Sequence, residues 1–237
     1  MMKQCFFVLM LSAVLFLSCS KKDPVRSTTS SFLVVNASPN AGNISVLQNL
    51  KSAGDYAYLT GLTKAAQYVT VDSGFNDYKI KKAATEYSNI LFANSDQHFS
   101  LFVYDTLVTG KVKSFFVKDE VDSTGMGNTS KIRVVQVSPD ADTLILVTPA
   151  IKDGSDSAFN GSPYYGKYSD DVIYSSVGYD EFYTGVRPVK VYSTLTKSYV
   201  RTYLFNFKKG GIYSFVFKGY LSRGGADSLS LSVIKHN

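Results

Sequence analysis

The chain has 237 residues, of which 45% are hydrophobic and 14% aromatic, so it can bury a sizeable core. Its formal net charge is +6, but no run of lysine and arginine is longer than two residues, which excludes a basic tract for nucleic acid. Two histidines and two cysteines exclude histidine-rich and four-cysteine metal motifs.

The N-terminus has the pattern of an export signal. Lys3 precedes an apolar run from Cys5 to Leu17, which is shorter than the ~20 residues of a membrane-spanning helix and fits a secretory signal peptide. A small residue, Ser18, stands directly before Cys19, and this ending resembles the bacterial lipobox. The resemblance implies a signal peptide over residues 1–18 and lipid on Cys19. An ordinary signal peptide followed by a chance cysteine is the alternative.

Lipidation would make a membrane the first expected partner, because two or more acyl chains attach a protein stably. Ser20 after the cysteine favours the outer membrane, by resemblance to the sorting of Gram-negative lipoproteins. With Cys5 removed and Cys19 lipidated, the exported chain has no thiol for a disulfide or a zinc site. Residues 19–30 are polar and lack apolar periodicity, which predicts a flexible tether.

Beyond the tether, short runs rich in Val, Ile, Tyr, Phe and Thr, bounded by turn residues, predict strands. These runs are Phe32–Ala37, Tyr68–Asp72, Asn89–Ala93, His98–Tyr104, Lys113–Val117, Lys131–Val137, Thr143–Val147, Pro188–Ser193, Val200–Phe207, Gly211–Lys218 and Leu229–Ile234. Alternation places on one side of a strand Tyr213, Phe215 and Phe217, and in the segment before it Tyr199, Arg201, Tyr203, Phe205 and Phe207. Helical spacing occurs only briefly, at Leu47–Ser52. The pattern predicts an all-β chain.

The chain also repeats itself. Phe32–Ala41 matches Ile132–Ala141 at an offset of 100, each a strand that runs into a Ser-Pro-Asx-Ala turn. His98–Asp105 matches Ile212–Gly219 at an offset of 114, so the second copy has an insertion at about residues 150–185. We expect two tandem immunoglobulin-like β-sandwich domains, at residues 31–120 and 131–237, joined by the polar link Asp119–Ser130. One continuous larger sheet is the alternative.

The doubled strand–Ser-Pro-Asx-Ala opening, the Tyr68…Gly74…Tyr78 stretch and the closing aromatic strand resemble the family called domain of unknown function 4397. Members of that family occur in tandem in secreted and lipid-anchored bacterial proteins. The resemblance covers about residues 31–237, and the second copy departs from it through the insertion. Because the family has no established activity, the resemblance implies the fold and leaves the function open.

No pattern for catalysis is found. A Ser-His-Asp hydrolase would have to use His98, which begins a strand, or His236, the penultimate residue, and no Gly-x-Ser-x-Gly elbow exists. Asp170-Asp171 and Asp180-Glu181 could supply a glycosidase pair, but adjacent acids in a polar loop are usually solvated. Asp153-x-x-Asp156 does not have the spacing of a calcium loop. We therefore expect no catalytic site, metal or cofactor.

The insertion carries tyrosines among Ser, Gly and Asp, a mixture typical of binding loops. The candidate binding residues, for an extracellular glycan or protein, are Tyr164, Tyr165, Tyr168, Tyr174, Tyr179 and Tyr183. The alternative is that these tyrosines pack on the sandwich. The function expected is a non-enzymatic binding or interaction module on a lipid anchor. A glycan or peptide hydrolase using Asp or Ser chemistry, and a structural subunit of an outer-membrane complex, are the alternatives.

Five tripeptides of Asp, a hydroxyl residue and then Ala, Leu or Thr resemble the acceptor pattern of O-glycosylation in some exported bacterial proteins. The candidate acceptors are Thr106, Ser123, Thr143, Ser157 and Ser228. The alternative is turn chemistry, because Asp followed by Ser or Thr often ends a strand.

Overall fold

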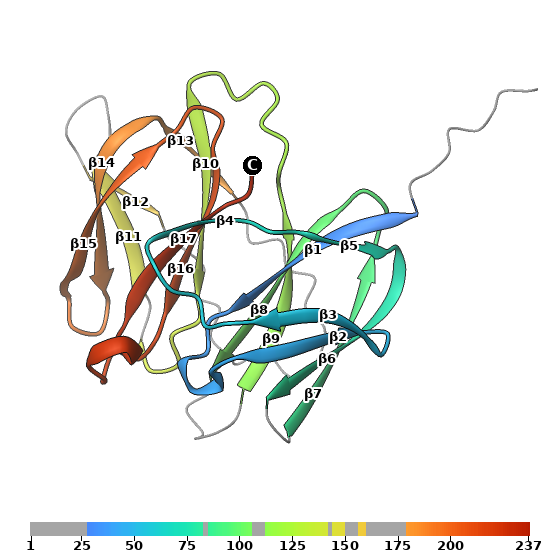
Figure 1. Cartoon of the computed structure of the whole chain (residues 1–237). Coiled ribbons are helices and arrows are strands. Elements are labelled where there is room, and N and C mark those ends of the chain that lie inside the picture. Colours follow the sequence, from blue (N-terminus) through green and yellow to red (C-terminus); the bar gives the residue numbers. More distant parts are fainter. Residues whose placement is uncertain (1–27, 83–84, 106–111, 142–143, 150–155, 160–178) are drawn as a thin grey trace, which may run out of the picture.

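The computed structural model describes residues 28–82, 85–105, 112–141, 144–149, 156–159 and 179–237, and this part of the chain is nearly all β (Figure 1). The first half of the chain forms β1 (Thr29–Asn36), β2 (Ile44–Gln48), β3 (Lys51–Tyr56), β4 (Thr63–Ala65), β5 (Val69–Asp72), β6 (Gly74–Lys82), β7 (Thr85–Ala93), β8 (His98–Asp105) and β9 (Val112–Asp119). The second half forms β10 (Thr129–Gln136), β11 (Leu144–Pro149), β12 (Asp156–Phe159), β13 (Asp180–Tyr183), β14 (Gly185–Ser193), β15 (Ser198–Phe207), β16 (Ile212–Lys218) and β17 (Ser230–Lys235). The described residues have two short 3₁₀ turns, η1 (Pro39–Ala41) and η2 (Gly225–Asp227), and no α-helix.

The two halves have matching strand orders. In the first half the sheets run β5-β1-β8-β9 and β3-β2-β6-β7, and in the second they run β13-β10-β16-β17 and β12-β11-β14-β15. Strands β1 and β8 pair in parallel, as β10 and β16 do. Because β-strands turn alternate residues to opposite faces, each pair of sheets can enclose one core. Phe32, Tyr78 and Leu101 lie in the core of the first half, and Phe207, Tyr213 and Phe215 in that of the second.

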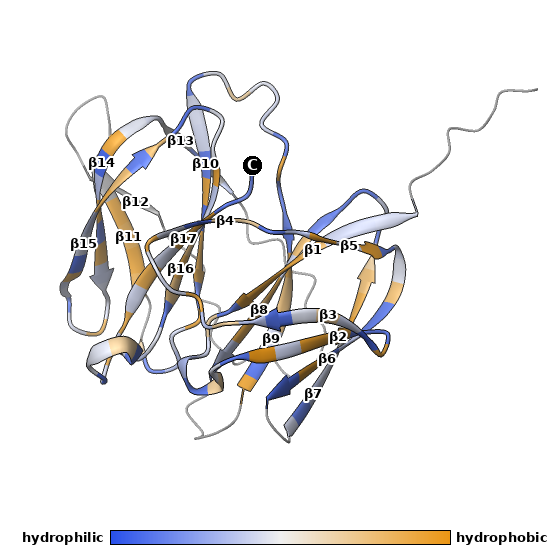
Figure 2. Ribbon diagram, in the orientation of Figure 1, coloured by the Kyte–Doolittle hydropathy of each residue, from blue (hydrophilic) through white to orange (hydrophobic). Residues whose placement is uncertain are grey.

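A third buried cluster lies between the halves. It joins Leu33, Val35 and Phe102 of the first half to Val135, Val216 and Ile234 of the second. The sheet of β8 and the sheet of β16 therefore face each other across an apolar layer, so four sheets stack in a β-sandwich-like arrangement. Burial on both faces explains why β8 and β16 read as nearly continuous apolar runs, and Figure 2 shows hydrophobic residues following these inner strands.

Strand β4 belongs to the first half in sequence and to the second half in its pairing. It adds to the edge of β17 in parallel, with Thr63 opposite Val233. Two backbone hydrogen bonds frame the contact, from Val233 N–H to the Leu62 carbonyl at 2.6 Å and from Ala66 N–H to the Lys235 carbonyl at 2.8 Å. Figure 1 shows this segment crossing between the halves before it returns to β5.

The Ser-Pro-Asx-Ala motif ends β1 with a hydrogen-bonded turn. The Ala41 N–H donates to Ser38 Oγ at 3.0 Å, which caps η1. Asn36 Nδ2 donates to the Gly42 carbonyl at 2.7 Å, and Gln136 Nε2 donates to the equivalent turn at 3.1 Å. Side chains at matching positions thus hold both turns, which is why the motif redirects the chain in each half.

The predicted strands all coincide with observed ones. Leu47–Ser52, where the sequence has brief helical spacing, closes the β2–β3 hairpin with Asn49 and Leu50 at positive φ. The strands also form several sheets, so the alternative of one continuous sheet is wrong.

The alternation expected along residues 199–207 is interrupted. Phe205 and Phe207 share one side as predicted and lie in the core, whereas Tyr199, predicted on the same side, is exposed. The register between β14 and β15 shifts between Val191 and Tyr192, and this β-bulge reverses the facing of the residues beyond it.

Within the described residues, no helix is long and apolar enough to cross a membrane.

Candidate functional site

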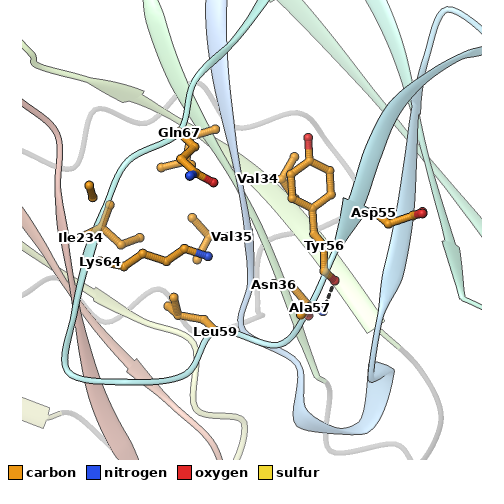
Figure 3. Close-up of a pocket in the computed structure, with 12 residues that line it drawn as sticks. Val34, Val35, Asn36, Asp55, Tyr56, Ala57, Leu59, Lys64, Gln67 and Ile234 are labelled. Carbon is orange, nitrogen blue, oxygen red and sulfur yellow. Dashed lines mark hydrogen bonds between the residues drawn. The ribbon is translucent and has the colours of Figure 1, made fainter.

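A pocket of about 170 Å³ lies between β1, the end of β3 and the segment that leads to β4 (Figure 3). Val34, Tyr56, Leu59, Lys64 and Gln67 line it from the first half, and Ile234 of β17 lines it from the second. The pocket therefore sits at the junction of the halves, although most of its wall comes from one of them.

The route of the chain creates the pocket. Strand β5 pairs with β1 only from Thr29 to Phe32. The segment before β5 contains β4, which pairs with β17 instead of β1. Among the described strands, none therefore pairs with Leu33–Asn36 on the side of β1 where β5 lies. At the far end, Leu59 N–H donates to the Asn36 carbonyl at 2.7 Å. A stretch of strand edge is thus left facing the pocket.

The pocket has an apolar floor and a polar rim. Leu59 and Ile234 belong to the buried layer between the halves. Figure 3 shows the side chain of Lys64 crossing the pocket toward Val35, while the carboxylate of Asp55 points away from it. Asp55 Oδ1 instead accepts a hydrogen bond from Ser45 Oγ at 2.5 Å. The charge directed into the pocket is therefore positive.

The size of the pocket restricts its ligand. Sites for drug-sized molecules occupy roughly 300–1,000 Å³, and this one has about 170 Å³. It suits one side chain or a small polar group. An edge such as Leu33–Asn36 can also pair with an extended segment of another chain, the mode called β-augmentation.

Residues 57–68, between β3 and β5, form what we call the pocket segment. Tyr58 binds this segment to the second half. Lys218 of β16 is buried, and its Nζ donates to Ser230 Oγ at 2.9 Å and to Tyr58 Oη at 3.2 Å. The same ammonium lies 4.5 Å from the centre of the Tyr58 ring. Burial lowers the pKa of Lys218 to about 8. These contacts hold the segment in place between β3 and β4.

A second polar cluster, which we call the polar lock, joins the halves within the buried layer. Arg133 of β10 and Asp119 of β9 form a fully buried ion pair. Arg133 Nε donates to Ser214 Oγ at 2.6 Å, while Asp119 accepts from Ser100 Oγ at 2.7 Å and from Tyr68 Oη at 2.8 Å. A buried ion pair is tolerated when such additional hydrogen bonds satisfy it.

His236 completes the polar lock. Its Nε2 lies 2.6 Å from Ser214 Oγ and its Nδ1 lies 2.7 Å from Tyr68 Oη, with Asp119 Oδ2 at 3.9 Å. Burial lowers the pKa of His236 to about 4, against the opposing effect of Asp119. Serine, histidine and aspartate meet here as in a hydrolase triad, but Ser214 is fully buried and cannot reach a substrate in this arrangement.

The sequence indicated little of either feature. The pocket residues Tyr56, Lys64 and Gln67 belong to no motif. For the polar lock, the available signal was Arg133, a charged residue inside an otherwise apolar strand. His236 was interpreted as a tail residue, although it is buried.

Most of the predicted tyrosines, Tyr164, Tyr165, Tyr168 and Tyr174, lie outside the described residues, as does the side chain of Tyr183 in β13. Tyr179 is half-buried, and its ring lies 4.8 Å from the Arg133 guanidinium, beside the polar lock. Burial raises its pKa. Strands β12 and β13 hold the places in the second half that β3 and β5 hold in the first.

Of the predicted modification sites, Cys19, Thr106, Thr143 and the side chain of Ser157 lie outside the described residues. Ser123 is half-buried, and Ser228 Oγ donates to the Gly225 carbonyl at 2.8 Å. In the described part of the chain, no group of three His, Cys, Asp or Glu side chains could hold a metal ion.

Comparison with known proteins finds one matching family model. The model described as Domain of unknown function (DUF4397) matches residues 30–147, which include β2 to β10 and most of β1 and β11. No curated protein matches the chain. Residues 30–147 are therefore similar to a DUF4397 domain, which supports the expected family for this part of the chain.

Proposed function

We propose that the protein is a non-enzymatic binding or interaction module of the cell envelope, anchored to the outer membrane by lipid on Cys19. Residues 1–18 are its signal peptide and residues 19–28 its tether, which is shorter than the expected 19–30 because Thr29 and Ser30 belong to β1 and pair with β5. The matching strand orders of the two halves support two tandem immunoglobulin-like domains, of which the second begins near Thr129.

The observation that carries the proposal is the pocket beside β1. It combines an apolar floor, the ammonium of Lys64 and the strand edge Leu33–Asn36. These features suit a protein partner that presents an extended segment, with one side chain or a carboxylate in the pocket. The tether would hold this surface off the membrane.

The Ser214–His236 contact does not favour the hydrolase alternative, because both side chains are buried in the layer between the halves. An accessory subunit would use the same kind of surface, and its partner would be an outer-membrane complex.

The test compares two tryptophan variants of the full chain at exposed positions of the β3–β4 segment. Ala57→Trp fills the pocket, which Ala57 lines, whereas Thr60→Trp changes a nearby residue that does not line it. Exposed substitutions usually change stability by no more than about 0.5 kcal/mol, so both variants should fold. Protein partners are recovered by cross-linking on intact cells, and glycan binding is measured on a glycan array.

We expect the wild type and Thr60→Trp to recover a common partner that Ala57→Trp loses. Recovery of the same partners by Ala57→Trp would remove the pocket as the binding site. A glycan bound equally by all three chains would contradict a protein partner in the pocket.

A further inference from the structure

Large apolar side chains are exposed at one corner of the first half, which we call the apolar corner. Leu50 is 73% exposed, Phe75 79%, Ile90 52% and Phe92 38%. The rings of Phe75 and Phe92 meet edge to face with their centroids 4.8 Å apart. Single exposed apolar residues are ordinary, but a cluster that includes an aromatic pair marks an interaction surface.

The sheet brings these residues together. Phe75 is the second residue of β6 and lies opposite Phe92 of β7, and Ile90 lies opposite Asp77. The β2–β3 turn joins them, because Asn49 N–H donates to the Asp77 carbonyl at 2.8 Å. Leu50 follows in that turn with φ of 67°, an uncommon conformation for a branched apolar residue. The outer face of this sheet thus has an apolar end.

The apolar corner lies where the tether enters the fold. Ser73, two residues before Phe75, donates its N–H to the Thr28 carbonyl at 2.7 Å. Beyond the end of β7, Asp96 N–H donates to the Thr29 carbonyl at 2.9 Å. Figure 1 shows the start of β1, the start of β6 and the β2–β3 turn at the same end of the first half.

The length of the tether keeps this end near the lipid. Eight residues lie between Cys19 and Thr28, and the nine steps from one Cα to the other span at most about 32 Å. A lipid chain on Cys19 would therefore keep the bilayer within reach of the apolar corner. Phenylalanine and leucine are among the residues that surface-bound proteins place at the boundary between headgroups and acyl chains.

We propose that the apolar corner docks on the bilayer that holds the lipid of Cys19, with Phe75 and Leu50 in the interfacial region. This inference rests on the proposed lipid anchor and adds a second contact with the same membrane. It fixes an orientation, because the sheet of β6 and β7 then faces the lipid and the second half lies on the far side of the stack (Figure 1).

The second half offers a matched control. Val186 follows a glycine at the start of β14, as Phe75 follows Gly74 at the start of β6. It is 60% exposed, but it lies on the opposite outer sheet of the stack, away from the tether. The chain contains no tryptophan, so one introduced tryptophan reports on its own surroundings.

The experiment uses lipidated full chains with Phe75→Trp or Val186→Trp in vesicles of phosphatidylethanolamine and phosphatidylglycerol. Brominated acyl chains quench tryptophan that enters the bilayer. We expect Phe75→Trp to shift its emission to the blue and lose intensity in brominated vesicles, and Val186→Trp to keep its emission unchanged. Flotation of the vesicles measures the lipid anchor separately.

Four results would overturn the inference. Chains that float with the vesicles while neither tryptophan is quenched would remove membrane docking and leave the anchor intact. Equal quenching of both tryptophans would mean that no particular face meets the lipid. Protection of Phe75→Trp from a soluble quencher without vesicles would show that a second copy covers the corner. Chains that do not float would overturn the anchor, and with it the inference.

Discussion

Single buried polar residues hold the two halves in register. In the polar lock, Asp119 and Tyr68 come from the first half and Arg133, Ser214 and His236 from the second. Apolar surfaces alone can slide, whereas a satisfied buried network requires one geometry. The lock therefore fixes how the two sheets face each other, and removing one member leaves another buried group without its partner.

The protonation of His236 should make the fold sensitive to acid. Its pKa falls from an ordinary 6.5 to about 4 on folding, so below about pH 6.5 the unfolded chain binds the proton more readily. This contribution to stability is present above about pH 6.5 and is lost as the pH falls through about 4. We expect it to amount to about 2–3 kcal/mol between about pH 7 and about pH 4.5.

Urea denaturation across this range measures the effect. The variant His236→Gln should lose less stability on acidification than the wild type, because it has no imidazole to protonate. Parallel pH profiles for the two proteins would mean that His236 does not titrate with folding.

At the scale of elements, the turns at the ends of strands direct the chain from one strand to the next. The turn after β16 depends on Gly219, which has φ of 80°. A Cβ at Gly219 would clash with the Ser228 carbonyl oxygen and lie 2.8 Å from that of Asp227. Gly61, in the pocket segment, has the same φ of 80° with nothing within 4 Å of its Cβ position.

These two glycines separate backbone strain from crowding. Gly61→Ala should cost about 1–2 kcal/mol, the usual penalty of a left-handed conformation. Gly219→Ala should cost roughly twice that or more, because the backbone must also move. Chemical denaturation of both variants measures the difference, and equal losses would show that the turn after β16 adjusts freely.

The elements that the sequence predicted best are those with the strongest apolar pattern. β8 and β16 are buried on both faces and were found from their composition. The predicted runs do not include β2, β3, β4, β6, β12 or β13. For β3 and β4 the reason is that no residue of either strand is fully buried and that β4 has only three residues. The crossing of β4 to β17 is a long-range pairing that no local pattern can indicate. For the same reason the pocket could not be predicted.

At the scale of the whole molecule, the stack of four sheets makes one body from two matching halves. The buried layer, the polar lock and the crossing of β4 all join them. Thr28, to which the proposed tether would connect, lies at one end of the first half, and the pocket lies at the junction with the second. An anchored protein with this arrangement would present the pocket above the membrane surface.

The anchor underlies both the proposed function and the orientation inferred from the apolar corner, and Cys19 tests it most directly. Cells that express the wild type or Cys19→Ala are labelled with palmitate and separated into membrane and soluble fractions. We predict that the wild type takes up the label and fractionates with membranes, because several acyl chains attach a protein stably. The Cys19→Ala variant should take up no label and leave the membrane fraction. A variant that still incorporates palmitate and remains with the membranes would contradict the account.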